Sequence, residues 1–187
     1  MAGFKKIIVL SGIPSSGKTT IGKLLNKKGY FYVPEIAEQL IKKGVTTGVD
    51  ANPMLDKTIM EVELQRDKYL FSLNKNLLVI ETWHPGNIAY ACLRNPPIAK
   101  QYKQIFQKIL KYHKVFGIYL NIPLDIFWKR TVKYKRDGRQ EIVMFFKRLQ
   151  NEILACHKEF GIPLVKINSN QSKKTVFHEV LDSIKNL

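Results

Sequence analysis

The stretch G-I-P-S-S-G-K-T, residues 12–19, fits the pattern G-x-x-x-x-G-K-[ST] at every position. An apolar run, KKIIVL at residues 5–10, comes directly before it, and the helical spacing of Ile21, Leu24 and Leu25 follows. A strand, a tight loop and a helix in this order surround phosphate oxygens with backbone N–H groups and the positive end of the helix. The stretch therefore predicts a binding site for a nucleoside triphosphate at the end of the first strand.

The residues of this loop have distinct expected roles. Gly12 and Gly17 allow the backbone to curl around the phosphates. Lys18 is expected to reach the β- and γ-phosphates, and the Thr19 hydroxyl to bind Mg²⁺. ATP and Mg²⁺ are thus the expected cofactors. The predicted nucleotide-binding residues are Gly12, Ile13, Pro14, Ser15, Ser16, Gly17, Lys18, Thr19 and Thr20.

Short apolar runs alternate with helical patterns along the rest of the chain. This alternation predicts an α/β fold with three layers, in which helices cover both faces of a five-stranded parallel sheet. We expect one kinase-like domain over residues 1–187, because no long linker or repeat interrupts the pattern. Ligands of such sheets bind at the carboxyl ends of the strands. The predicted strands are residues 5–10, 30–33, 77–80, 115–120 and 163–167, and the clearest later helices are about 53–74, 142–153 and 172–184.

The charge of the chain is strongly positive, with 31 Lys and Arg against 15 Asp and Glu and a net charge of +16. Such a surface attracts phosphate-rich partners, so nucleic acid is a compatible partner. Most of the excess is lysine spread over helical segments, for which an ordinary solvated surface is the alternative explanation. The charge alone does not decide between the two.

Other features place the chain among cytoplasmic proteins. No apolar run approaches the roughly 20 residues that a membrane-spanning helix needs, so no membrane partner is expected. Cys92 and Cys156 lack the spacing of metal ligands and are expected to be reduced thiols. A homodimer is compatible with the sequence.

Two glutamates follow predicted strands at the edge where ligands bind. Glu81 ends the strand at residues 77–80, where a carboxylate can hold Mg²⁺ or accept a proton. Glu35 follows the strand at residues 30–33 and Pro34, and can act as the general base for an acceptor hydroxyl. Alternatively, Glu35 is a first-turn helix acid that only favours the helix dipole.

A basic segment, at about residues 129–141, lies between two helical stretches. Arg130 and Arg136 can close over the nucleotide as a lid and neutralise charge in the transition state of phosphoryl transfer. A solvated basic loop is the alternative. The four histidines are scattered, and none is expected to be catalytic.

At these residues the chain resembles the thymidylate kinase and deoxynucleoside kinase group. Residues 81–90, ETWHPGNIAY, are similar to the thymidylate kinase pattern D-R-Y-x-x-S-x-x-A-Y, with Ala89 and Tyr90 identical and Trp83 aromatic. Glu35 matches the glutamate that the group carries after its second strand. The resemblance implies a phosphotransferase that acts on a nucleoside or nucleoside monophosphate, with Trp83 and Tyr90 at the substrate.

Two further positions bear on the substrate. Arg66, in the long helix at about residues 53–74, resembles an arginine that the group places near its substrate. The group's arginine after the strand-end acid is replaced here by Thr82. Because that arginine helps to bind phosphate in the group, the resemblance does not choose between a nucleoside and a nucleoside monophosphate.

Two other functions remain open at this level. One is a kinase of nucleic-acid ends that uses the basic surface, and the other is a regulatory NTP-binding module with slow hydrolysis. A GTPase is disfavoured because no Asn-Lys-x-Asp box follows a later strand. Transfer to an added acceptor separates both kinases from the regulatory module.

Overall fold

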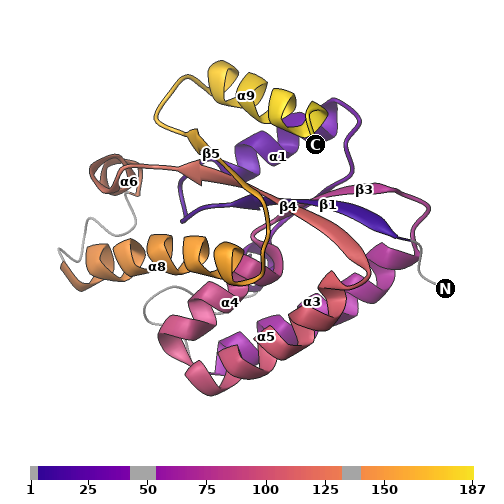
Figure 1. Cartoon of the computed structure of the whole chain (residues 1–187). Coiled ribbons are helices and arrows are strands. Elements are labelled where there is room, and N and C mark those ends of the chain that lie inside the picture. Colours follow the sequence, from indigo (N-terminus) through magenta and orange to yellow (C-terminus); the bar gives the residue numbers. More distant parts are fainter. Residues whose placement is uncertain (1–3, 43–53, 132–139) are drawn as a thin grey trace.

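In residues 4–42, 54–131 and 140–187, which the computed structural model describes, five parallel strands form one sheet in the order β2-β3-β1-β4-β5 (Figure 1). The strands are β1 (Lys5–Ser11), β2 (Tyr32–Val33), β3 (Leu77–Glu81), β4 (His113–Asn121) and β5 (Leu164–Asn168). The predicted five-stranded parallel sheet is confirmed.

Helices connect the strands and cover both faces of the sheet. In the described residues they are α1 (Lys18–Lys27), α2 (Ile36–Lys42), α3 (Met54–Ser72), α4 (Trp83–Arg94), α5 (Pro96–Leu110), α6 (Leu124–Arg130), α8 (Gln140–Glu159) and α9 (Lys173–Lys185). None of them combines the length and the apolar character that a bilayer crossing needs.

The central strand β1 explains why the chain begins with an unbroken apolar run. Its residues Ile7, Ile8, Val9 and Leu10 are all completely buried, because helices cover the sheet on both sides. Ile8 and Leu10 face α1 and α9, whereas Ile7 and Val9 belong to the larger core beneath the other face.

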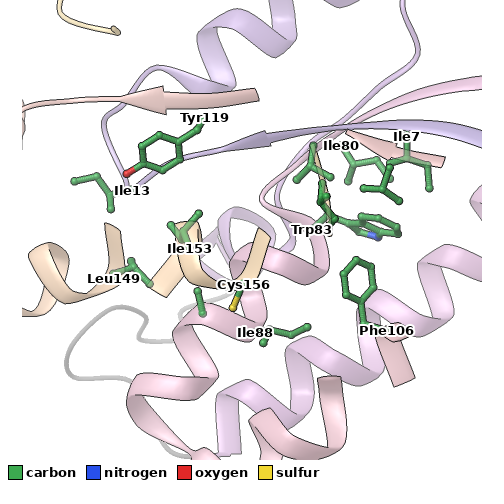
Figure 2. Packing of buried hydrophobic residues seen from close by; sticks show 14 of the residues in the cluster. Ile7, Ile13, Ile80, Trp83, Ile88, Phe106, Tyr119, Leu149, Ile153 and Cys156 are labelled. Carbon is green, nitrogen blue, oxygen red and sulfur yellow. The ribbon is translucent and has the colours of Figure 1, made fainter. Parts of the chain in front are cut away.

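The larger core is built from α3, α4, α5 and α8 (Figure 1). Figure 2 shows Trp83 of α4 between the strand residues Ile7 and Ile80 and the ring of Phe106 on α5. The Trp83 and Phe106 rings meet edge to face, with their centroids 5.3 Å apart. This packing fixes the start of α4 directly beneath the carboxyl end of β3.

Register places the ends of the inner strands side by side. Leu10 of β1 pairs with Glu81 of β3 and with Ile118 of β4. The loop that follows β1 and the acid that ends β3 therefore meet at one edge of the sheet. This is the edge at which parallel α/β sheets bind ligands.

One helix, α4, lies where the sequence did not clearly predict it. The sequence of α4 contains Pro85 and Gly86, which usually interrupt helices. Pro85 is tolerated because it lies in the first turn, where its missing N–H would have had no helical partner. A side chain on Gly86 would lie 2.5 Å from the Thr82 side chain, so glycine is needed there.

The predicted C-terminal helix and its cap are confirmed. The Ser172 side chain accepts a hydrogen bond of 3.1 Å from the Thr175 N–H and so caps α9. Val176, Val180 and Ile184 of α9 are buried against the sheet.

Candidate active site

The loop between β1 and α1 has the backbone form that the motif predicts. Gly12, Ser15 and Gly17 have positive φ angles of 140°, 61° and 97°. A side chain on Gly12 would lie 2.7 Å from the Leu120 carbonyl oxygen and from Ser16 Oγ, so only glycine fits. Gly17 is the N-cap of α1, which begins at Lys18. The loop thus places the positive end of α1 at the carboxyl edge of the sheet.

Lys18 lies back over this loop. Its Nζ donates hydrogen bonds of 2.9 Å to the Gly12 carbonyl oxygen and of 3.2 Å to the Ile13 carbonyl oxygen. The side chain is buried, so its ammonium group is held inside the loop rather than in solvent. A cation in this position lies where the motif puts the β- and γ-phosphates.

Glu81 joins the loop to β3. Thr19 Oγ1 donates a hydrogen bond of 2.7 Å to Glu81 Oε1, and the Tyr32 hydroxyl donates a short hydrogen bond to Oε2. Burial, and then the hydrogen bond to Glu81, raise the pKa of Tyr32, which therefore remains a donor.

The Thr19 hydroxyl and the Glu81 carboxylate are the oxygen ligands that Mg²⁺ prefers. Their contact places both of the predicted metal-binding residues at one point beside the phosphate loop. The donor set and its position therefore fit a Mg²⁺ ion bound together with nucleotide phosphates.

Glu35 lies in the connection between β2 and α2. Burial raises the pKa of Glu35; the Lys18 ammonium opposes this shift, and the Glu81 carboxylate adds to it. These opposing effects place Glu35 within electrostatic reach of both the loop cation and the strand-end acid. A carboxyl group with a raised pKa is suited to take a proton at a pH near neutrality.

Arg66 of α3 supports the same connection. One guanidinium nitrogen donates a hydrogen bond of 2.8 Å to the Pro34 carbonyl oxygen, directly before Glu35, and another lies 2.5 Å from Glu63 Oε2. Arg66 is mostly buried, with 13% of its side chain exposed. Its observed contacts hold the backbone next to Glu35.

The aromatic residues from the family resemblance take different places. Trp83 is completely buried, and its indole N–H donates a hydrogen bond of 3.0 Å to Asp67 Oδ1. This placement favours a packing role for Trp83 over the expected contact with substrate. Tyr90 is partly buried between the Phe145 ring and the Arg94 guanidinium, which lies 4.8 Å from the Tyr90 ring centre.

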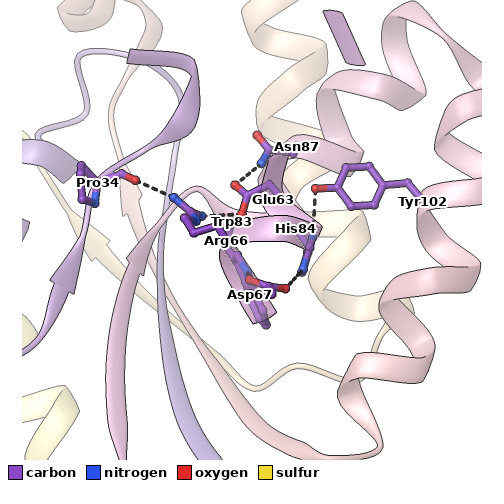
Figure 3. A network of polar contacts seen from close by, with 8 residues as sticks. All are labelled: Pro34, Glu63, Arg66, Asp67, Trp83, His84, Asn87 and Tyr102. Atoms are coloured by element: carbon purple, nitrogen blue, oxygen red, sulfur yellow. Dashed lines mark hydrogen bonds and ion pairs between the residues drawn. The ribbon is translucent and has the colours of Figure 1, made fainter. Parts of the chain in front are cut away.

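Sequence reasoning missed a buried polar network between α3, α4 and α5 (Figure 3). Asn87 Nδ2 donates a hydrogen bond of 2.9 Å to Glu63 Oε1, and His84 lies 2.6 Å from Asp67 and 2.9 Å from the Tyr102 hydroxyl. Burial raises the pKa of Glu63, against the effect of Arg66. The available signal was acidic residues at helical spacing within the buried face of α3.

A second buried histidine supports the start of the loop. His157 Nδ1 lies 2.8 Å from the Ile153 carbonyl oxygen, so it carries the proton, and Nε2 is left to accept from Ser11 Oγ at 3.1 Å. Burial lowers the pKa of His157, which favours this neutral form. His157 therefore positions the residue before Gly12.

The predicted lid is described only at its edges. Arg130 ends α6 and donates a hydrogen bond of 3.2 Å to the Ser169 carbonyl oxygen. The next residue, Thr131, has its hydroxyl 3.1 Å from Ser15 Oγ, so this end of the segment adjoins the phosphate loop. Arg136 lies outside the described residues, as does the middle of the lid segment.

Comparison with known proteins agrees with this arrangement. A family model described as an AAA domain matches residues 7–174. No curated protein matches the sequence. Among solved structures, deoxyadenosine kinase from M. mycoides, with products dCMP and a flexible dCDP bound, superimposes with a TM-score of 0.68 at 14% identity, covering 97% of this chain and all of that one.

Two other solved structures have the same fold. The same deoxyadenosine kinase with bound dATP gives a TM-score of 0.59 at 17% identity, over 96% of this chain and 99% of that one. The NadR protein in complex with NR gives 0.70 at 16% identity, over 98% of this chain but 50% of that one. The chain therefore spans about half of NadR. The predicted resemblance to P-loop nucleoside kinases is confirmed for the fold.

Proposed function

Because this chain belongs to the AAA domain family, we propose that it is an ATP-dependent phosphotransferase that uses Mg²⁺ and phosphorylates a nucleoside or nucleoside monophosphate. One observation carries the proposal: the 2.7 Å hydrogen bond from Thr19 to Glu81 joins the phosphate loop to a strand-end acid. Phosphoryl transfer needs such a site, since it depends on positioning and charge more than on covalent chemistry by the protein.

The residues at this edge take complementary roles in transfer. Lys18 binds the β- and γ-phosphates, and Thr19 and Glu81 hold Mg²⁺, which supplies positive charge to those phosphates when bound. Glu35 removes the proton from an acceptor hydroxyl. Arg130 and Arg136 neutralise charge on the migrating group when the lid segment closes, which also keeps water from the γ-phosphate.

The surroundings of Glu35 support a small acceptor. Arg66 holds the Pro34 carbonyl directly before Glu35, and Glu35 lies within electrostatic reach of Lys18 and Glu81. The proposal of a thymidylate-kinase-like acceptor rests on the match at Ala89 and Tyr90. A pyrimidine deoxynucleoside and its monophosphate are therefore the first compounds to examine. The dCMP product and NR named in the structures of similar fold support nucleosides as the wider class.

The test is acceptor-dependent release of ADP. We expect slow ATP hydrolysis by the protein alone and a marked rise when the correct nucleoside or nucleoside monophosphate is added, because the acceptor replaces water at the γ-phosphate. The screen uses labelled ATP, a panel of ribo- and deoxynucleosides with their monophosphates, NR, and oligonucleotide ends. A rise with oligonucleotide ends alone would favour the nucleic-acid kinase, and no rise with any acceptor would favour the regulatory module.

A second prediction concerns Glu81. In Glu81→Gln, an NH₂ group replaces one oxygen of the metal-binding carboxylate, and the negative charge is lost. We expect a higher Mg²⁺ requirement and a lower kcat, measured across a Mg²⁺ titration, because carboxylate oxygens bind this ion better than amides. Glu179→Gln, on α9 and away from the loop, is the control. An unchanged Mg²⁺ dependence in Glu81→Gln would remove Glu81 from the proposed metal site.

A further inference from the structure

Beyond this site, two cysteines that lie far apart in the sequence meet between α4 and α8. Cys92 lies in the last turn of α4, and Glu152 and Cys156 lie four residues apart on α8, where helical spacing puts them on the same side. The two Sγ atoms and a carboxylate oxygen of Glu152 all lie within 4.8 Å of one another. Among the described residues, this is the group of three whose side chains are arranged to share a metal ion.

We propose that Cys92, Glu152 and Cys156 form a binding site for a thiophilic divalent cation, with Zn²⁺ as the best match. Two thiolates select a borderline or soft ion, whereas the oxygen-only pair of Thr19 and Glu81 selects Mg²⁺. Tetrahedral Zn²⁺ lies about 2.3 Å from sulfur and about 2.0–2.2 Å from oxygen. Small rotations of three side chains that are already this close bring their ligand atoms to such distances.

Burial gives the cluster one closed side and one open side. Cys156 is completely buried in the core beside Leu149 and Ile153 (Figure 2). Cys92 and Glu152 are partly exposed, and Cys92 lines a surface pocket together with Ala99 and Lys103 of α5. A metal ion can enter through this pocket, and three protein ligands leave a fourth position for water.

The charge of the three ligands favours a divalent cation. Two thiolates and a carboxylate carry three negative charges, so a bound divalent ion leaves one in excess. Lys103, which pairs with Glu159 at 2.7 Å, lines the same pocket as Cys92. Both sulfurs bind Zn²⁺ as thiolates, so metal binding is coupled to loss of the thiol protons.

The experiment uses the full chain, reduced and freed of metal with a chelator, and titrated with Co²⁺ as a spectroscopic probe. We expect one equivalent of Co²⁺ to produce thiolate-to-metal charge-transfer absorption, and one equivalent of Zn²⁺ to remove it. Zn²⁺ should also raise the unfolding temperature, since an ion that bridges α4 and α8 binds only the folded chain.

Variants identify the ligands. Cys92→Ser and Glu152→Gln change partly exposed side chains, so both proteins are expected to fold, and circular dichroism verifies this. Loss of a ligand should weaken Zn²⁺ binding by at least about 10- to 100-fold. That range is typical when a residue that only hydrogen-bonds to a metal ligand is removed. Glu179→Gln, a partly exposed glutamate on α9 across the sheet, should bind like the wild type.

Three results would overturn the proposal. The first is a wild-type titration without charge-transfer absorption at stoichiometric Co²⁺. The second is undiminished Zn²⁺ affinity in Cys92→Ser. The third is a cysteine pair that forms a disulfide in air and, once reduced, fails to bind either ion, which would assign a redox role to the pair instead.

Discussion

Replacing Lys18 by alanine is expected to remove nearly all phosphate transfer while the protein stays folded. The Lys18 ammonium is the positive charge that the loop holds at the predicted position of the β- and γ-phosphates, where charge develops during transfer. Loss of one preorganised donor to such charge typically lowers kcat by about 10²–10³-fold, and loss of a full charge should do at least as much.

Stability should change far less than activity. Within the folded protein, Lys18 donates hydrogen bonds to two loop carbonyls, each with a net contribution of about 1.5–3 kcal/mol for a charged donor. Alanine also removes the cost of burying a cation, so the unfolding temperature without ligand should stay near that of the wild type. Lys23→Ala, an exposed lysine on the same helix, is the matched control. Wild-type transfer by Lys18→Ala would contradict the proposed function itself.

The second large effect is expected for Glu35→Gln, and its size reports the acceptor. If a hydroxyl is phosphorylated, loss of the general base should lower kcat by about 10²–10⁴-fold. If the acceptor is already a phosphate, no proton of high pKa has to be removed, and the effect should be small. Exposed Glu61 on α3 provides the control substitution. A large loss with a phosphate acceptor would show that Glu35 positions the substrate rather than acting as a base.

The pH dependence gives an independent test of the same residue. Burial raises the pKa of Glu35, and a general base must be deprotonated to act. As the pH is lowered, kcat/KM of the wild type should therefore fall with an apparent pKa above the usual range for glutamate. An acid limb within the usual range would contradict this assignment.

The same shift has a defined sign in stability. Because the folded protein binds the Glu35 proton more tightly than the unfolded chain does, its contribution is most favourable below the unfolded pKa, about 4.3. That contribution is lost as the pH rises through the raised folded pKa. Glu35→Gln should therefore gain stability relative to the wild type between acid and neutral pH, as measured by urea unfolding.

The phosphate loop and the sheet could be predicted because each depends on neighbours in the sequence. Residues 12–19 fit a local pattern whose backbone form is set by glycines at fixed positions, and the structure has those positive φ angles. The inner strands β1, β3 and β4 were visible as apolar runs because a parallel sheet covered on both faces leaves little polar surface there. By contrast, α4 was obscured by Pro85 and Gly86, whose tolerance depends on their place in the helix.

The sequence alone therefore predicts the α/β fold, the phosphate loop, the acid that ends β3 and the acid that follows β2. Which distant residues meet follows from the tertiary structure: Thr19 with Glu81, Arg66 with the Pro34 carbonyl, and Cys92 with Cys156. The physical reason is that a local pattern fixes backbone form and burial over a few residues, whereas contacts between distant segments follow from strand order and helix packing. The same packing placed Trp83 in the core, where a matched motif alone had suggested a surface for substrate.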